Sequence, residues 1–201
     1  MKVFALIAVF VITVFATSCS SGGGKKVVVM SSGKMQLDSK DNKTIIFEPG
    51  TQHNDLELTL GADDKSVTVK SPSGDKTYDI PDNALYVLNL KSDTIIGNLV
   101  NYGSSGIPSS ITTEELQRII DSTQQLLVGA NASDEKKTYF LVPNSIKKIS
   151  ANLSAQVLSP YKNIPYKVEV DKDGNAPETY KFFTNKQKRE SLNELLERMK
   201  R

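Results

Sequence analysis

The segment LELTLGADDKSVTVKSPSGDKTYDI, Leu56 to Ile80, indicates the fold class of this chain. Its runs LELTL and SVTVK alternate apolar and polar side chains, as half-buried strands do. The turn residues GADDK separate the two runs, so we expect a β-hairpin from Leu56 to Lys70. A second turn, SPSGD at Ser71 to Asp75, contains Gly74, which can adopt a positive φ. Short strands joined by tight polar turns are typical of antiparallel sandwiches and barrels.

The same pattern extends outward from this segment over Val27 to Tyr102. Its β-prone runs are KVVVMS, KTIIFE, DLELTL, KSVTVK, KTYDI, ALYVLNL and DTIIGNLV. They lie close together and are separated by turn residues, which favours a sheet of short antiparallel strands. We therefore predict an antiparallel β-rich domain, sandwich-like or barrel-like, over residues 27–104.

A change of composition follows at NYGSSGIPSS, Asn101 to Ser110, where Gly, Ser and Pro predict a linker or long loop. The next stretch predicts a helix at about 112–129. Thr112 as N-cap and Glu115 three residues later form a capping box, and Gly129 suits the C-terminal end.

Strand patterns then return in TYFLVP, AQVLSPY, YKVEV and TYKFF. The residues Asp171 to Glu178, DKDGNAPE, predict a hairpin turn between the last two runs. A second capping box at Thr184 and Gln187 begins a C-terminal helix at about 185–200. Strands, helix, strands and helix without a regular alternation indicate the α+β class, with residues 105–201 as its α+β region.

The N-terminus has the features of an export signal. Met1 and Lys2 precede the apolar run Val3 to Ala16, which is shorter than the roughly 20 residues a membrane-spanning helix needs. A basic start, a short apolar core and small residues after it predict a signal peptide over residues 1–18.

The residues Ala16-Thr17-Ser18-Cys19 resemble the lipobox of bacterial lipoproteins. The resemblance implies that the Cys19 sulfur takes a diacylglycerol, that residues 1–18 are removed, and that the new amino terminus is acylated. Several acyl chains hold a protein stably on a membrane. The alternative is an ordinary signal peptide that leaves Cys19, the only cysteine of the chain, as a free thiol.

The lipid anchor sets the expected location. Residues 19–26, rich in Ser, Gly and Lys, predict a flexible tether between the lipid and the domain. By analogy with known lipoproteins, serine after the cysteine favours the outer membrane, and the basic Lys25 and Lys26 favour its periplasmic leaflet. Exposure on the cell surface is the alternative.

Composition excludes some function classes. The chain is 38% hydrophobic and 24% charged, as a globular protein is, and its net charge is only +2. A nucleic-acid partner normally requires a strong basic excess, so we expect none.

Catalytic, metal and cofactor motifs are weak. His53 is the only histidine, which leaves too few ligands for a Cys/His zinc site, and we interpret it as a loop residue before a strand. Asp171 to Glu178 begins like a calcium loop, but its glycine and glutamate are displaced, so a turn explains it better than a weak metal site. Asp55 and Glu57, close to His53, are the only carboxylates that the sequence suggests for catalysis.

We therefore assign no catalytic, cofactor or metal residue, and Cys19 is the predicted lipidation site. The sequence predicts a non-catalytic, membrane-anchored envelope module that binds a protein or polymer partner. The alternative is a carboxylate-dependent hydrolase acting on envelope polymers.

Overall fold

The computed structural model describes residues 24–102 and 112–200. The predictions for the signal peptide at 1–18, for Cys19 and for most of the linker lie outside the described residues. Within them the elements are β1 Lys25–Asp38, β2 Asp41–Leu60, β3 Ser66–Lys70, β4 Lys76–Asp79, β5 Leu85–Leu90, β6 Ile95–Leu99, α1 Thr113–Leu127, β7 Thr138–Leu141, β8 Ser145–Ser150, β9 Gln156–Leu158, β10 Thr179–Thr184 and α2 Asn185–Met199.

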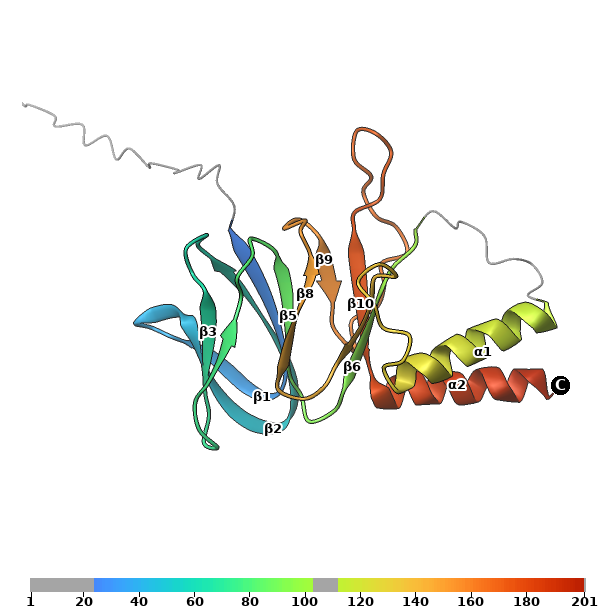
Figure 1. Cartoon of the computed structure of the whole chain (residues 1–201), viewed down its shortest axis with the longest axis horizontal. Coiled ribbons are helices and arrows are strands. Elements are labelled where there is room, and N and C mark those ends of the chain that lie inside the picture. Colours follow the sequence, from blue (N-terminus) through green and yellow to red (C-terminus); the bar gives the residue numbers. More distant parts are fainter. Residues whose placement is uncertain (1–23, 103–111, 201) are drawn as a thin grey trace, which may run out of the picture.

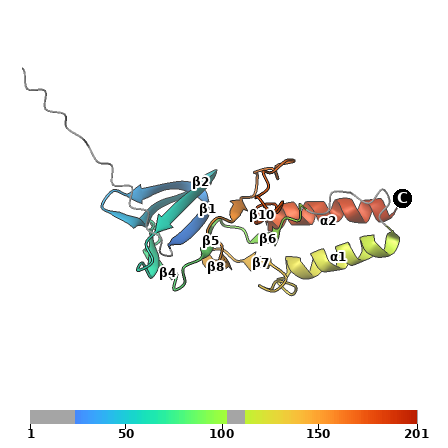
Figure 2. The same cartoon turned by 90° about the horizontal axis from the view of Figure 1, so that it is seen from above.

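These elements form three layers along the long axis of the molecule. Six strands make a curled, barrel-like sheet in the order β4-β3-β2-β1-β5-β8, and four make a second sheet in the order β7-β6-β10-β9. The helical pair follows the second sheet at the far end (Figure 1), and the view from above gives the same succession (Figure 2). The predicted α+β class with a β-rich, barrel-like first half is confirmed.

Each layer boundary has its own apolar core. Val27 and Val29 of β1 face the inside of the curled sheet, whereas Val28 and Met30 face the second sheet. The unbroken run VVVM is typical of a strand buried on both faces. We call the second core, between the two sheets, the inter-sheet core. A third, smaller core joins Ile96 of the second sheet to the helices.

The hairpin predicted from Leu56 to Lys70 is wrong. β2 is continuous across GTQHN, and its last residue, Leu60, pairs with Lys25 of β1. β3 instead pairs in parallel with the beginning of β2, where Thr68 is opposite Thr44. The two alternating runs are therefore neighbours in sequence but not partners in the sheet. The end of β2 pairs with β1, and β3 pairs with the other edge of the beginning of β2.

The turn at Ser71 to Asp75 is confirmed. β3 and β4 pair antiparallel on either side of it. Gly74 has a φ of 116°, and its amide donates to the Ser71 carbonyl oxygen at 2.9 Å. The β-prone runs thus supply most of the strands, but three neighbouring pairs, β1–β5, β2–β3 and β9–β10, run parallel.

Sheet membership crosses the predicted division at residues 104 and 105. β6 precedes it and belongs to the second sheet, whereas β8, a strand not predicted, follows it and pairs with β5 of the first sheet. Lys25 and Lys26, predicted as tether, begin β1. The Lys25 ammonium donates to the carbonyl oxygens of Ala62 and Asp64, which gives this buried lysine its partners.

Both predicted helices are confirmed with their capping boxes. Thr112 and Glu115 bond reciprocally at the start of α1, and Thr184 and Gln187 do so at the start of α2. Gly129, just beyond α1, has a φ of 78°, the left-handed conformation that ends helices. Among the described residues, no helix is both long and apolar enough to cross a bilayer.

Candidate functional site

His53 and Asp55 lie on one face of β2, directly after a β-bulge. Between Ser32 and Gly33 the pairing of β1 with β2 shifts, from Ser32 opposite His53 to Gly33 opposite Pro49. Residues 50–52 of β2 are therefore left outside the ladder. His53 and Asp55 are two residues apart on an extended strand, so their side chains leave the same face. His53 thus lies within a strand and not in the predicted loop.

Lys91, directly after β5, meets His53. Its side chain is buried, and its ammonium donates to the Ser31 carbonyl oxygen at 2.7 Å. The same nitrogen lies 3.3 Å from His53 Nδ1. Burial lowers the pKa of Lys91, while partial burial and then the Lys91 charge lower the pKa of His53. The imidazole is therefore favoured in its neutral form, with Nδ1 accepting from the lysine.

Asp55 holds the beginning of the loop that connects β9 with β10, residues 159–178, which we call the β9–β10 loop. The Ser159 hydroxyl donates to Asp55 Oδ2 at 2.6 Å, and the Lys162 ammonium lies 3.1 Å from the same oxygen. These contacts join positions about a hundred residues apart in sequence. They fix the loop to the face of β2.

Lys181 of β10 holds the same segment from the other side. Its ammonium donates to the carbonyl oxygens of Ser159 and Lys162, both at 2.6 Å. The residue is only 6% exposed, and burial lowers its pKa to about 8. Buried lysines need such partners because an unpaired charge is costly away from water. We call Asp55, Lys91 and Lys181, with the residues they bind, the basic clamp.

Tyr161 completes the clamp. Its ring stacks on His53 with centroids 4.2 Å apart and lies 5.9 Å from the Lys91 ammonium. Its φ of 106° is rarely adopted by a residue with a side chain. Such backbone strain persists only where surrounding contacts enforce it. The stack on His53 and the flanking bonds of Ser159 and Lys162 supply those contacts.

Beyond Lys162 the loop is exposed. Tyr166 is 96% exposed, Val170 58% and Ile164 43%. YKVEV, residues 166–170, is not a strand, so the predicted hairpin around Asp171 to Glu178 is wrong. The reason is that β10 already has partners on both edges, β6 and the parallel β9. Both sides of the loop, including Tyr166 and Val170, line an open hollow of about 860 Å³ together with the end of β6, the residues after it and Lys137.

The tip of the loop is closed by Asp171. Its Oδ1 accepts the amides of Asp173 and Asn175 at 2.9 and 2.8 Å, and its Oδ2 accepts the Asn175 side chain at 3.2 Å. These bonds lower the pKa of Asp171 and explain the acidic tip as turn chemistry. Within residues 24–102 and 112–200, no group of three or more His, Cys, Asp or Glu side chains is arranged to hold a metal ion.

The clamp brings together a histidine, an aspartate and a serine, but not as a proton relay. A nucleophilic serine needs a base within hydrogen-bond reach. Here Ser159 donates to Asp55, while His53 Nδ1 faces Lys91. Glu57, on the same face of β2, pairs with Lys26 at 2.9 Å. The geometry therefore suits the positioning of a loop better than acyl transfer or a carboxylate pair.

Sequence reasoning singled out His53 and Asp55 and missed Lys91, Ser159 and Lys181. One signal was available: Lys181 interrupts the aromatic run TYKFF in the middle of a strand. A lysine at such a position is either at an edge or buried with partners. Which partners it finds depends on contacts across the whole chain.

Lys181 gives the stability a specific pH dependence. Its pKa is about 8 in the folded protein, whereas an ordinary lysine, as in the unfolded chain, has a pKa of 10.5. Between these values the unfolded state binds more protons, so stability rises with pH. We expect the free energy of unfolding to rise by about 2 kcal/mol from pH 8 to pH 10 because of this group.

The measurement is urea unfolding at several pH values, with Lys181→Gln as the matched variant. Glutamine retains N–H donors for the two carbonyl oxygens but carries no charge. Its stability curve should lack the part of the rise that Lys181 contributes, while the parts that come from Lys91 and Lys188 remain. Parallel curves for the two proteins would contradict a lowered Lys181 pKa.

Comparisons with protein-family models, with curated proteins and with solved structures find no significant match to this chain.

Proposed function

We propose that this protein is a membrane-anchored bacterial lipoprotein that acts as a non-catalytic binding module of the cell envelope, with the β9–β10 loop as its contact surface. The observation that carries the proposal is that one part of this loop is bound to the sheets while another part is exposed. Its first residues are bound by the basic clamp, whereas Tyr166 and Val170 extend into solvent.

A loop held in this way is suited to binding. Ordering a mobile segment on association costs free energy, and a segment that is already fixed avoids part of that cost. Tyrosine contributes a large contact area with few rotatable bonds, which is why contact surfaces are enriched in it. The charged groups of the clamp are occupied with each other and with main-chain carbonyl oxygens, which supports a positioning role for them.

The anchor is the second part of the proposal, and it rests on the lipobox-like residues Ala16 to Cys19. We place the lipid on Cys19 and the protein in the periplasmic leaflet of the outer membrane. With Cys19→Ala, we expect the tagged full chain to leave the membrane fraction and to lose incorporation of a labelled fatty acid, because no other cysteine can take the lipid.

Cell fractionation and fatty-acid labelling of the same cultures provide the measurement. Ser20→Ala, one residue away, is the matched control and should remain membrane-bound and labelled. An unlabelled wild-type chain, or a Cys19→Ala chain that stays on the membrane, would count against the anchor. Protease treatment of intact cells tests the leaflet, since loss of a C-terminal tag would place the domain on the cell surface.

A further inference from the structure

We infer that the exposed part of the β9–β10 loop, from Ile164 to the tip at Asp173, rests in the interfacial region of the lipid bilayer that holds the anchor, so that the domain contacts the membrane at two points. This inference rests on the proposed lipid anchor. It assigns the exposed side chains Tyr166, Val170 and Ile164 to the headgroup region of a membrane.

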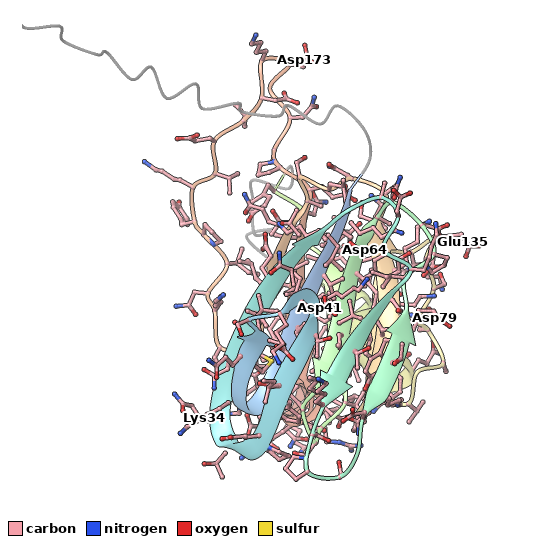
Figure 3. All side chains as sticks on the ribbon, turned by 90° about the vertical axis from the view of Figure 1, so that its left-hand side faces the viewer. Lys34, Asp41, Asp64, Asp79, Glu135 and Asp173 are labelled. Carbon is pink, nitrogen blue, oxygen red and sulfur yellow. The ribbon has the colours of Figure 1, made fainter. Side chains whose placement is uncertain are left out.

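The loop tip and the start of β1 lie on the same side of the molecule, the upper side in Figure 1, although they are separated along its long axis. Lys25 at the start of β1 bonds to the turn after β2, and Lys26 pairs with Leu85 at the start of β5. Leu85 pairs in turn with Ser150 at the end of β8, from which the chain leads to β9 and the loop. Figure 1 shows the orange-red loop rising beyond the sheets on this side, and Figure 3 shows Asp173 at its tip, higher than the beginning of β1.

The length of chain before β1 limits the distance to the membrane. Cys19 and Gly24 are separated by five residues, which span at most about 17 Å when fully extended. A lipid on Cys19 therefore keeps the start of β1 close to the bilayer surface. The loop tip rises farther than the start of β1 on this side of the molecule, so it meets a bilayer on this side before the sheets do.

The exposed side chains of the loop have the chemistry of this region. Tyrosine is enriched where bilayers meet water, because its ring is apolar and its hydroxyl is polar. Tyr166 is almost fully exposed, and Val170 and Ile164 add exposed apolar surface to the same segment. Lys167 and Lys172 extend from the same segment, and lysine side chains can reach lipid phosphates while their stems stay in apolar surroundings.

Apolar contact and proximity, rather than net charge, drive this association. The three lysines at positions 162, 167 and 172 are more than balanced by the four carboxylates of the loop, Glu169, Asp171, Asp173 and Glu178. The anchor supplies a high effective concentration of the loop at the surface, so a weak contact is sufficient. The basic clamp fixes the first residues of the loop and thereby limits the freedom of its exposed part.

A fluorescence-quenching experiment on the full lipidated chain tests the inference. With the Cys19 sulfur alkylated by its lipid, a single introduced cysteine is the only free thiol for an environment-sensitive dye. Asp173→Cys places the dye at the loop tip. Asp75→Cys is the matched control. It is the same exchange in the exposed turn between β3 and β4, on the side of the molecule opposite to the loop tip.

Both proteins are reconstituted into phosphatidylethanolamine–phosphatidylglycerol vesicles that contain a headgroup nitroxide lipid. We expect the dye at position 173 to lose about half of its emission or more, and the dye at position 75 to be unaffected, since nitroxides quench only nearby probes in the interfacial zone. Adding Tyr166→Ser and Val170→Ser to Asp173→Cys should move its quenching toward that of the control.

The possible outcomes distinguish a failure of the membrane contact from a failure of the proposed lipid anchor. If the intact mass shows no lipid on Cys19, the anchor fails and this inference fails with it. If the lipid is present but positions 173 and 75 are equally unquenched, only the membrane contact is wrong, and the loop faces an envelope protein or polymer instead. Quenching that the two serine substitutions leave unchanged would refute the assigned side chains.

Discussion

Phe182→Ala is expected to lower the free energy of unfolding by about 3–5 kcal/mol, the range for removing a large aromatic ring from a core. Phe182 lies in β10, is fully buried, and belongs to the inter-sheet core. The ring is one of the side chains that join the curled sheet to the second sheet. Its loss leaves a cavity that two rigid sheets cannot close.

The neighbouring strand is built around this ring. A Cβ on Gly97 of β6, which pairs with Phe182, would lie only 2.4 Å from the ring atom Cε1. Gly97 therefore leaves the space that Phe182 fills, and the two positions are complementary. Because a glycine inside a strand is itself unfavourable, its presence here indicates that close packing against the ring is needed.

Urea unfolding followed by far-UV circular dichroism measures the effect, since the chain has no tryptophan. Phe183→Ala is the matched control, one residue along and therefore on the opposite face of the strand. Its ring is only partly buried, and it lies 5.0 Å and 4.3 Å from the ammonium groups of Lys181 and Lys188. We expect a loss of about 1–2 kcal/mol there. Equal losses for the two variants would contradict the assignment of Phe182 to the inter-sheet core.

Local patterns predicted the local structure well. Both capping boxes, at Thr112 and Thr184, mark the starts of α1 and α2, because a cap is a contact between residues three positions apart. The β-prone runs before Tyr102 all lie in or at strands for the same reason. Gly74 could be assigned a positive φ because a short turn requires one.

Long-range pairing was not predictable in this way. The runs DLELTL and KSVTVK have the pattern of a hairpin, yet they pair with β1 and with the beginning of β2 respectively. YKVEV has a strand pattern, but both edges of β10, its predicted partner, are taken by β6 and β9. A sequence pattern indicates that a segment can form a strand, whereas its partner depends on which edges the rest of the fold leaves open.

The same limit applies to the basic clamp. Lys91 and Lys181 resemble surface lysines in sequence, and only the fold brings them to the carbonyl oxygens of Ser31 and Ser159. His53 and Asp55 were noticed because they are close in sequence. Their partners Ser159 and Tyr161 lie about a hundred residues away, beyond the reach of any local pattern.

Gly33→Ala is expected to destabilise the protein by about 3 kcal/mol or more, because it combines backbone strain with a backbone clash. Gly33 has a φ of 138°, and a Cβ there would lie 2.1 Å from the Glu48 carbonyl oxygen. The clash is with main-chain atoms of β2, so no side-chain rotation relieves it. The bulge between β1 and β2 would have to open.

Gly74→Ala separates the two causes. Gly74 also has a positive φ, 116°, but a Cβ there would meet no atom within 4 Å. We expect it to cost about 1 kcal/mol, the strain alone. Urea unfolding of the two variants beside the wild-type protein measures the difference. A loss at Gly33 no larger than that at Gly74 would show that the bulge can absorb the clash.

Opening the bulge should also displace the residues of the basic clamp, because Gly33 and the clamp contact the same neighbouring residues. The Gly33 carbonyl oxygen accepts from the Asn54 side chain at 2.6 Å, and Ser31, two residues earlier, accepts from Lys91. His53 lies opposite Ser32 in the same ladder.

The titration of His53 measures this effect. Since His53 is the only histidine of the chain, one imidazole NMR signal reports its titration. Its pKa, lowered in the wild-type protein by burial and Lys91, should rise toward the ordinary histidine value in Gly33→Ala and stay unchanged in Gly74→Ala. An unchanged His53 pKa in a destabilised Gly33→Ala protein would mean that the bulge supports the sheet without positioning the clamp.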